Sequence, residues 1–205
     1  MQLLLVHGLG RTPLSLAGLS RFLRRQGHHV ERVGYLAAIE PFEQIQRRVR
    51  GRLERLARSG QPYGVIGHSL GGLALRAALR EVEPAPVHFI MLGTPNQPPR
   101  LAHRLANNWL YRLLGGESGQ LLARAEFFTQ LPQLRTPYTI VAGAAGHRGR
   151  LSPFGYEAND WVVAVEETKL SAADQPLVLP VGHTFMMNDY QVRQAIQRVL
   201  GQGVA

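Results

Sequence analysis

Short apolar runs and longer amphipathic segments alternate along the chain. The longer segments repeat apolar residues every three or four positions, as helices do, whereas the short runs have the length of buried strands. Strands are predicted near residues 2–7, 29–33, 63–67, 87–92, 137–142 and 176–181, and helices near residues 15–26, 41–59, 70–82 and 189–200. Such alternation is typical of the α/β class, so we expect a six-stranded, mostly parallel sheet with helices on both faces.

The segment at residues 96–136 is too long for an ordinary connection between two strands. Its apolar residues again recur every three or four positions, in two runs on either side of Gly115 and Gly116. This spacing predicts two amphipathic helices joined by a glycine hinge. The helices could cap a site or simply pack against the sheet.

The composition fits one globular domain. The 205 residues are 45% hydrophobic, which is ordinary for a chain with a sizeable core, and we expect residues 1–205 to form a single domain. No apolar run is long enough to span a membrane, and the opening run is interpreted as the first strand rather than a secretory signal. We therefore expect a cytoplasmic protein.

Cysteine is absent, which excludes a disulfide framework, a thiol nucleophile and a thiolate metal site. The glycine-rich stretch at residues 143–149 lacks the G-x-G-x-x-G pattern and the downstream acid of a dinucleotide site. The sequence therefore predicts neither a cofactor nor a metal.

The formal net charge of +9 comes almost wholly from arginine, since Lys169 is the only lysine. Several arginines fall between residues 47 and 58, on a predicted helix whose other face is apolar, and we interpret them as a solvated outer face. No RRM, KH or zinc-finger pattern accompanies them, so no nucleic-acid partner is expected. Peripheral contact with an anionic membrane, or binding of an anionic substrate, stays open.

The sequence GHSLGG at residues 67–72 contains the pattern G-x-S-x-G. It follows a predicted strand and precedes a predicted helix, which is the context in which this pattern holds an exposed nucleophilic serine on a sharp turn. We therefore predict that Ser69 is a nucleophile. The alternative is a glycine-rich turn in which the serine only caps the helix.

A serine nucleophile needs a histidine base and an acid that orients the histidine, and after this kind of turn the chain order is serine, acid, histidine. His183 follows the last predicted strand and is the favoured base, with His147 as its rival. The chain has three aspartates, Asp160, Asp174 and Asp189. Asp160 is favoured because Asp174 suits a turn and Asp189 follows the base; Glu157 is the fallback.

The oxyanion of a tetrahedral intermediate also needs hydrogen-bond donors. One is expected from the backbone N–H of Leu70, directly after the nucleophile. The other is expected from Leu9, in the loop HGLG at residues 7–10 after the first strand. His7 is interpreted as a residue that shapes this loop through backbone hydrogen bonds.

These landmarks, together with GTP at residues 93–95, NDWVV at residues 159–163 and Gly182-His183, resemble the α/β-hydrolase superfamily, and within it the small bacterial lipase and esterase branch. The resemblance covers nearly the whole chain. It implies a minimal α/β-hydrolase fold with Ser69 as nucleophile, Asp160 as acid, His183 as base, and Leu9 and Leu70 as oxyanion-hole donors. The chain departs from the family in two places. Trp161 follows the acid where the family often has glycine. The chain also begins directly with the strand that leads to His7, whereas larger members have two strands before it.

The resemblance also implies that residues 96–136 form a helical cap, or lid, over the site. Trp109, Phe127 and Phe128 would then form an apolar wall for an acyl chain, with Trp161 as a further candidate near the acid. The implied activity is hydrolysis of a small ester or lipid through an acyl-enzyme. The alternatives are a thioesterase or acyltransferase with the same triad, or a non-catalytic binding protein on a hydrolase fold.

Overall fold

The computed structural model describes residues 1–202 and contains one sheet of six strands in the order β2-β1-β3-β4-β5-β6. All five strand pairings are parallel, which confirms the expected architecture. The strands are β1 (Gln2–Val6), β2 (His29–Val33), β3 (Tyr63–His68), β4 (His88–Leu92), β5 (Tyr138–Gly143) and β6 (Leu177–Leu179). Because β3 is central, the loops after its neighbours converge on the residue that follows it.

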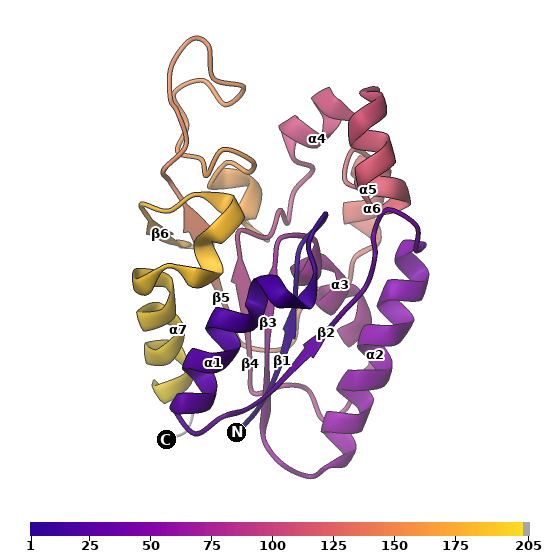
Figure 1. The fold of residues 1–205 in the computed structure, drawn as a ribbon, viewed down its shortest axis with the longest axis vertical. Coiled ribbons are helices and arrows are strands. Elements are labelled where there is room, and N and C mark those ends of the chain that lie inside the picture. The colour runs from indigo at the N-terminus through magenta and orange to yellow at the C-terminus, as the bar shows by residue number, and fades with distance from the viewer. Residues whose placement is uncertain (203–205) are drawn as a thin grey trace.

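Helices cover both faces of the sheet (Figure 1). The helices α1 (Ala17–Arg25) and α7 (Tyr190–Gln202) pack on one face, and α2 (Phe42–Arg58) and α3 (Leu70–Ala78) on the other. Successive residues of β1 alternate between the two cores: Leu3 and Leu5 face the first, and Leu4 and Val6 the second. Because both faces of β1 are buried, consecutive residues of the strand are apolar instead of alternating with polar residues.

Two of the predicted helices combine an α-helix with a 3-10 turn. The 3-10 turn η1 (Pro13–Leu16) leads into α1, and η2 (Leu79–Glu81) follows α3. On the outer face of α2, each of the six arginines lies within 4.0 Å of a glutamate carboxylate, as expected for a solvated surface. Within residues 1–202, no helix is both long and apolar enough to cross a bilayer.

The segment at residues 96–136 forms three helices, so the prediction of two is wrong. They are α4 (Arg100–Leu105), α5 (Trp109–Leu121) and α6 (Ala125–Gln130). Asn108 starts α5 by accepting hydrogen bonds from the N–H groups of Leu110 and Tyr111, which separates α4 from α5. The glycine break does exist, inside α5: Gly116 has φ 54° and ψ −149°, and a Cβ there would lie 2.3 Å from the carbonyl oxygen of Ala37.

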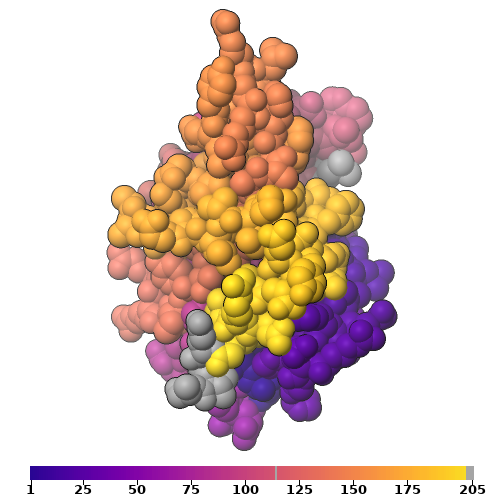
Figure 2. Space-filling view, turned by 90° about the vertical axis from the view of Figure 1, so that its left-hand side faces the viewer, coloured from indigo at the N-terminus to yellow at the C-terminus, as the bar shows by residue number. Residues whose placement is uncertain are grey.

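The connection between β5 and β6 is long and contains a further 3-10 turn, η3 (Glu166–Thr168). Figure 2 shows its first part, coloured orange, projecting from one end of the molecule. In Figure 1 this projection and α4 lie at the same end as the carboxyl ends of the strands. The site predicted from the sequence falls at this end.

Candidate active site

Ser69 sits on a strained turn between β3 and α3. Its backbone has φ 53° and ψ −126°, a region that residues other than glycine rarely adopt. The turn is tight enough to need glycine nearby, since a Cβ at Gly67 would lie 2.4 Å from Cα of Gly72, and one at Gly71 would lie 2.3 Å from the carbonyl oxygen of Val6. The Ser69 side chain makes no capping hydrogen bond to α3, contrary to the capping alternative.

The Ser69 hydroxyl instead faces His183. Its Oγ lies 2.9 Å from Nε2 of His183, and Nδ1 of the same ring lies 2.6 Å from Oδ2 of Asp160. A carboxylate only accepts hydrogen bonds, so Nδ1 carries the proton and Nε2 is left as the acceptor for the serine hydroxyl. The structure thus joins Ser69, His183 and Asp160, all three buried, in one hydrogen-bonded line.

Backbone hydrogen bonds fix the orientation of Asp160. Its Oδ1 accepts from the N–H groups of Val162 and Val163 at 3.0 and 2.7 Å, which leaves Oδ2 for the histidine. The N–H of His183 donates to the carbonyl oxygen of Asp160 at 2.9 Å. Asp160 and His183 are therefore held together by their backbones as well as by their side chains.

The other candidate acids and bases lie elsewhere. Asp174 accepts from the N–H groups of Leu170 and Ser171, Asp189 accepts from the N–H of Gln191 at the start of α7, and Glu157 pairs with Arg100. His147 is exposed, and its ring stacks beside Trp161 with centroids 6.5 Å apart. None of these side chains is hydrogen-bonded to Ser69 or His183.

The two expected oxyanion donors flank Ser69. Leu70 is the first residue of α3, and Leu9 lies in the loop after β1. Among the described residues, neither backbone N–H donates to a protein acceptor, so both remain available. Gly8 brings the loop close to the serine, because a Cβ there would lie 2.9 Å from Cβ of Ser69.

His7 shapes this loop, as the sequence suggests. Its Nδ1 donates to the carbonyl oxygen of Gly8 at 3.0 Å, and its ring stacks on Tyr35 with centroids 4.2 Å apart. The hydroxyl of Tyr35 donates to the carbonyl oxygen of His7. Burial lowers the pKa of His7 below its ordinary value, which keeps the ring neutral.

A second histidine, His68, lies directly before Ser69 and is also buried. Its Nε2 is 3.0 Å from the carbonyl oxygen of His183, so this nitrogen must carry the proton. Burial lowers the pKa of His68 well below its ordinary value, with a further contribution from His183. No sequence pattern indicates this contact, because it depends on how the loops that carry His68 and His183 pack together.

A cavity of about 310 Å³ opens beside Ser69 and His183. Its walls are mostly apolar and come from the loops after β1 and β4, the segment at residues 96–136 and the Asp160 loop. The apolar residues that line it include Leu9, Leu101, Leu105, Tyr111, Leu122, Val162 and Val163. The helices α4 and α5 thus cover one side of the cavity.

The predicted apolar wall of Trp109, Phe127 and Phe128 is wrong for this cavity. Trp109 is 72% exposed at the start of α5. Phe127 and Phe128 are buried in the core beside α2, where the ring of Phe127 meets that of Phe42 at 5.0 Å. Helical spacing placed Phe127 and Phe128 on the apolar face of a helix. It could not indicate that this face packs against α2, which is far away in the sequence.

Trp161 does not line the cavity either. It is 59% exposed and lies on the outer side of the Asp160 loop, beside His147. Its φ of 83° lies in the left-handed region that glycine adopts freely. This fits a position at which the α/β-hydrolase family, which the sequence resembles, often has glycine. The indole is thus largely exposed and is not among the residues that line this cavity, whereas the backbone at Trp161 has a conformation that glycine would adopt without strain.

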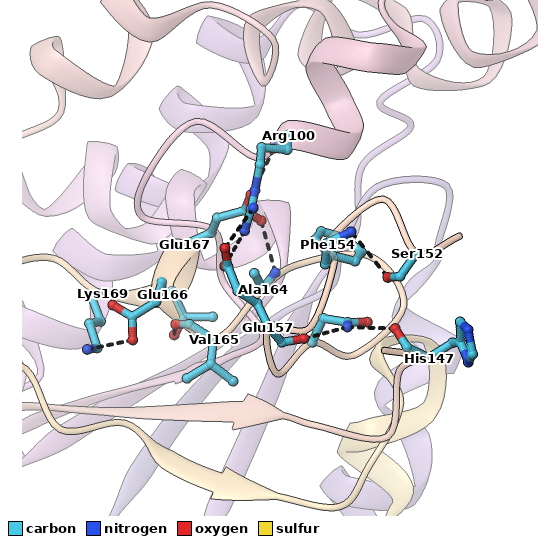
Figure 3. Close-up of polar contacts among 12 residues, drawn as sticks. Arg100, His147, Ser152, Phe154, Glu157, Ala164, Val165, Glu166, Glu167 and Lys169 are labelled. Carbon is cyan, nitrogen blue, oxygen red and sulfur yellow. Dashed lines mark hydrogen bonds and ion pairs between the residues drawn. The ribbon is translucent and has the colours of Figure 1, made fainter. Parts of the chain in front are cut away.

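An arginine on α4 anchors the Asp160 loop (Figure 3). The backbone N–H and Nε of Arg100 donate to Oε1 of Glu167 at 3.0 and 2.9 Å, and its Nη1 donates to Oε1 of Glu157 at 3.0 Å. Oε2 of Glu167 accepts from the N–H of Ala164 at 2.9 Å. These two glutamates flank Asp160 in sequence, so Arg100 ties the acid loop to α4. The Arg100 contact lowers the pKa of Glu157.

Within residues 1–202, no group of three or more histidine and carboxylate side chains is placed to hold a metal ion. The polar groups that do converge are Ser69, His183 and Asp160, with free backbone N–H groups on both sides. This arrangement can activate a hydroxyl and stabilise a developing oxyanion.

No protein-family model and no curated protein matches this sequence. Solved structures do match. The mature form of the Bacillus licheniformis lipase BlEst2 aligns over 97% of this chain and 91% of its own, with 19% identity and a TM-score of 0.77. A structure from a study of the metagenome-derived lipolytic enzymes LipS and LipT aligns over 98% and 92%, with 13% identity and a TM-score of 0.70.

An extracellular α/β-hydrolase from a Paenibacillus species aligns over the full length of both chains, with 15% identity and a TM-score of 0.64. These identities are low, and what the three proteins share with this chain is the arrangement of the sheet and its helices. The parallel sheet, the strained serine turn after its central strand and these structural matches lead to one conclusion. The chain has the α/β-hydrolase fold.

Proposed function

We propose that this protein is a serine hydrolase of carboxylic esters, of the esterase or lipase type. Ser69 is the nucleophile, His183 the general base and acid, and Asp160 the group that orients His183. The observation that carries the proposal is the pair of hydrogen bonds at His183: Oγ of Ser69 donates to its Nε2 at 2.9 Å, and its Nδ1 donates to Oδ2 of Asp160 at 2.6 Å. A serine on a strained turn with this partner set has few roles other than nucleophilic catalysis.

The reaction has two halves. First, Oγ of Ser69 bonds to the ester carbonyl carbon while Nε2 of His183 takes the hydroxyl proton, and the N–H groups of Leu9 and Leu70 bind the oxyanion. The carbon–oxygen bond to the alcohol then breaks, and His183 protonates the leaving oxygen. Water next attacks the acyl-enzyme with His183 as base, which releases the carboxylic acid and restores Ser69.

The cavity supports an ester with a short or medium acyl chain. Its volume of about 310 Å³ is at the lower end of the range for small-molecule sites. Its apolar wall from α4 and α5 suits an acyl group, so we assign residues 96–136 the role of a cap within a single domain. The named lipase and lipolytic neighbours fit an ester or lipid substrate.

Hydrolysis of p-nitrophenyl esters from acetyl to palmitoyl, together with labelling by a fluorophosphonate, tests the proposal. We expect wild type to react with the probe and to prefer shorter chains. Ser69→Ala should lose the label and at least about a thousandfold of the activity while keeping its fold. Ser171→Ala, at an exposed serine, is the matched control and should behave as wild type.

The outcomes separate the alternatives. Labelling without ester turnover would favour a thioesterase or acyltransferase that uses the same acyl-enzyme. Neither labelling nor turnover would favour a binding protein on a hydrolase fold. Activity that survives in Ser69→Ala would contradict the assignment of the nucleophile.

A further inference from the structure

Arg11 is the one permanently charged side chain among the described residues that line the Ser69 cavity. It follows the Leu9 loop and shares the cavity wall with Ser69, His183 and Thr184. The rest of the wall is mostly apolar. Arg11 is only partly buried, so its guanidinium reaches solvent at the edge of this apolar wall and can also meet a ligand in the cavity.

The structure holds the Arg11 guanidinium in place without neutralising it. Nη2 donates to the carbonyl oxygen of Thr184, and the group lies over the Phe185 ring at 5.0 Å from its centroid. Within residues 1–202, no carboxylate oxygen lies within 4.0 Å of it, so its charge is not neutralised by an ion pair.

The charge of Arg11 acts on the site itself. Burial and then His183 lower the pKa of His68 most, and the charge of Arg11 adds a smaller contribution in the same direction. The His68 ring lies 4.9 Å from that of His183 between centroids. A guanidinium has five N–H groups, and the hydrogen bond to Thr184 uses one of them. Arg11 is thus an oriented cation with donors to spare, next to the reacting groups.

The position of Arg11 indicates which part of an ester it would meet. Its anchor, Thr184, directly follows His183, and His183 must reach the leaving oxygen to protonate it. The apolar residues of α4 and α5 form a different part of the wall and suit the acyl group. A charged group on the alcohol part would therefore lie toward Arg11.

We propose that Arg11 selects esters whose alcohol part carries an anionic group, a carboxylate or a phosphate. This inference rests on the ester-hydrolase function proposed above. Arg11 forms and breaks no covalent bond; it binds the anion by charge and hydrogen bonding and so positions the leaving group beside His183. The products are a carboxylic acid and an anionic alcohol.

The test compares three butyrate esters: that of methyl 4-hydroxybenzoate, which is neutral, that of 4-hydroxybenzoate, and that of 4-hydroxyphenyl phosphate. For each enzyme, kcat/KM for an anionic ester is divided by kcat/KM for the neutral ester. Dividing a variant's ratio by the wild-type ratio removes the intrinsic reactivity of each substrate. The variants are Arg11→Met, Arg11→Lys and, as a control on an exposed arginine of α1, Arg25→Met.

We expect Arg11→Met to lower the ratio about tenfold for at least one anionic ester, and the larger loss identifies carboxylate or phosphate as the preferred anion. In Arg11→Lys the ratio of anionic to neutral kcat/KM should stay close to the wild-type value, and in Arg25→Met it should equal that value. Added salt should lower the wild-type ratio more than the Arg11→Met ratio.

Two results would overturn the inference. An equal loss on the neutral and anionic esters in Arg11→Met would mean that Arg11 only supports the loop of His183. A wild type that hydrolyses the neutral ester faster than both anionic esters, with a ratio that Arg11→Met leaves unchanged, would mean that the charge is not used. A wild type that hydrolyses no ester and takes no fluorophosphonate label would instead remove the proposed function, and the inference with it.

Discussion

His68 donates its Nε2 proton to the carbonyl oxygen of His183 at 3.0 Å. This hydrogen bond joins the residue before Ser69 to the backbone of His183, across 115 positions of sequence. It complements the bond from the N–H of His183 to the carbonyl oxygen of Asp160, so that His183 is held from two sides.

Loss of this donor should disturb the position of His183 more than the binding of substrate. We expect His68→Ala to lower kcat about tenfold with a smaller change in KM, because the freed carbonyl lets His183 drift from Ser69. His68→Gln can still donate and should recover part of the loss. A rise in KM at unchanged kcat would instead assign His68 to the substrate wall.

Stability should fall as the solution becomes acidic. Burial lowers the folded-state pKa of His7, His68 and His88 below the unfolded value near 6.5. Below pH 6.5 the unfolded chain therefore binds more protons than the folded protein, and the free energy of unfolding decreases with falling pH. Urea unfolding at pH 7 and pH 5 measures this change, which should be smaller in His68→Gln. An equal change in both proteins would contradict a neutral buried His68.

The Arg100 anchor should stabilise the Asp160 loop. Glu167 is 6% exposed, so Arg100→Gln leaves a buried carboxylate without its cation. We expect a loss of roughly 2 kcal/mol in the free energy of unfolding and a lower kcat. Arg47→Gln, in an exposed pair on α2, is the control and should change stability by less than about 0.5 kcal/mol. Equal effects of the two variants would show that the anchor adds nothing.

The backbone at Trp161 offers a test of strain. Trp161→Gly and Trp161→Ala both remove the indole, but only glycine adopts φ 83° without cost. We expect the glycine variant to be about 1 kcal/mol more stable than the alanine variant, measured by urea unfolding. If alanine were the more stable, the left-handed conformation at this position would be in doubt.

Sequence patterns predicted the sheet well because central parallel strands are apolar throughout and are bounded by turns, as in β1 and β3. They also indicated Ser69, Asp160 and His183, which the fold brings together, because glycines mark the serine turn and the chain has few aspartates. They failed in the segment at residues 96–136. There, periodicity indicates which side of a helix is buried but not what it packs against. Phe127 packs against Phe42, which lies 85 positions away, and only the folded chain reveals that pairing.

The contact of Arg100 with the Asp160 loop could not be predicted from the sequence for the same reason. Its partners Glu157 and Glu167 are 57 and 67 positions away, and nothing in a run of charged residues indicates which pairs will form. The contacts of Arg11 with Thr184 and Phe185 were likewise not predictable, because no local pattern links residues so far apart in the sequence.

The shortness of β6 has a consequence for how the proposed activity would be lost on heating. This strand has three residues, pairs only with β5 at the edge of the sheet, and is followed within four positions by His183. Edge segments with few ladder hydrogen bonds open locally before the rest of a protein unfolds. A partial opening there would carry His183 away from Ser69 while the helices stay formed. Amide exchange should therefore be fastest in this part of the sheet, and on heating catalysis should stop before the helical circular-dichroism signal declines.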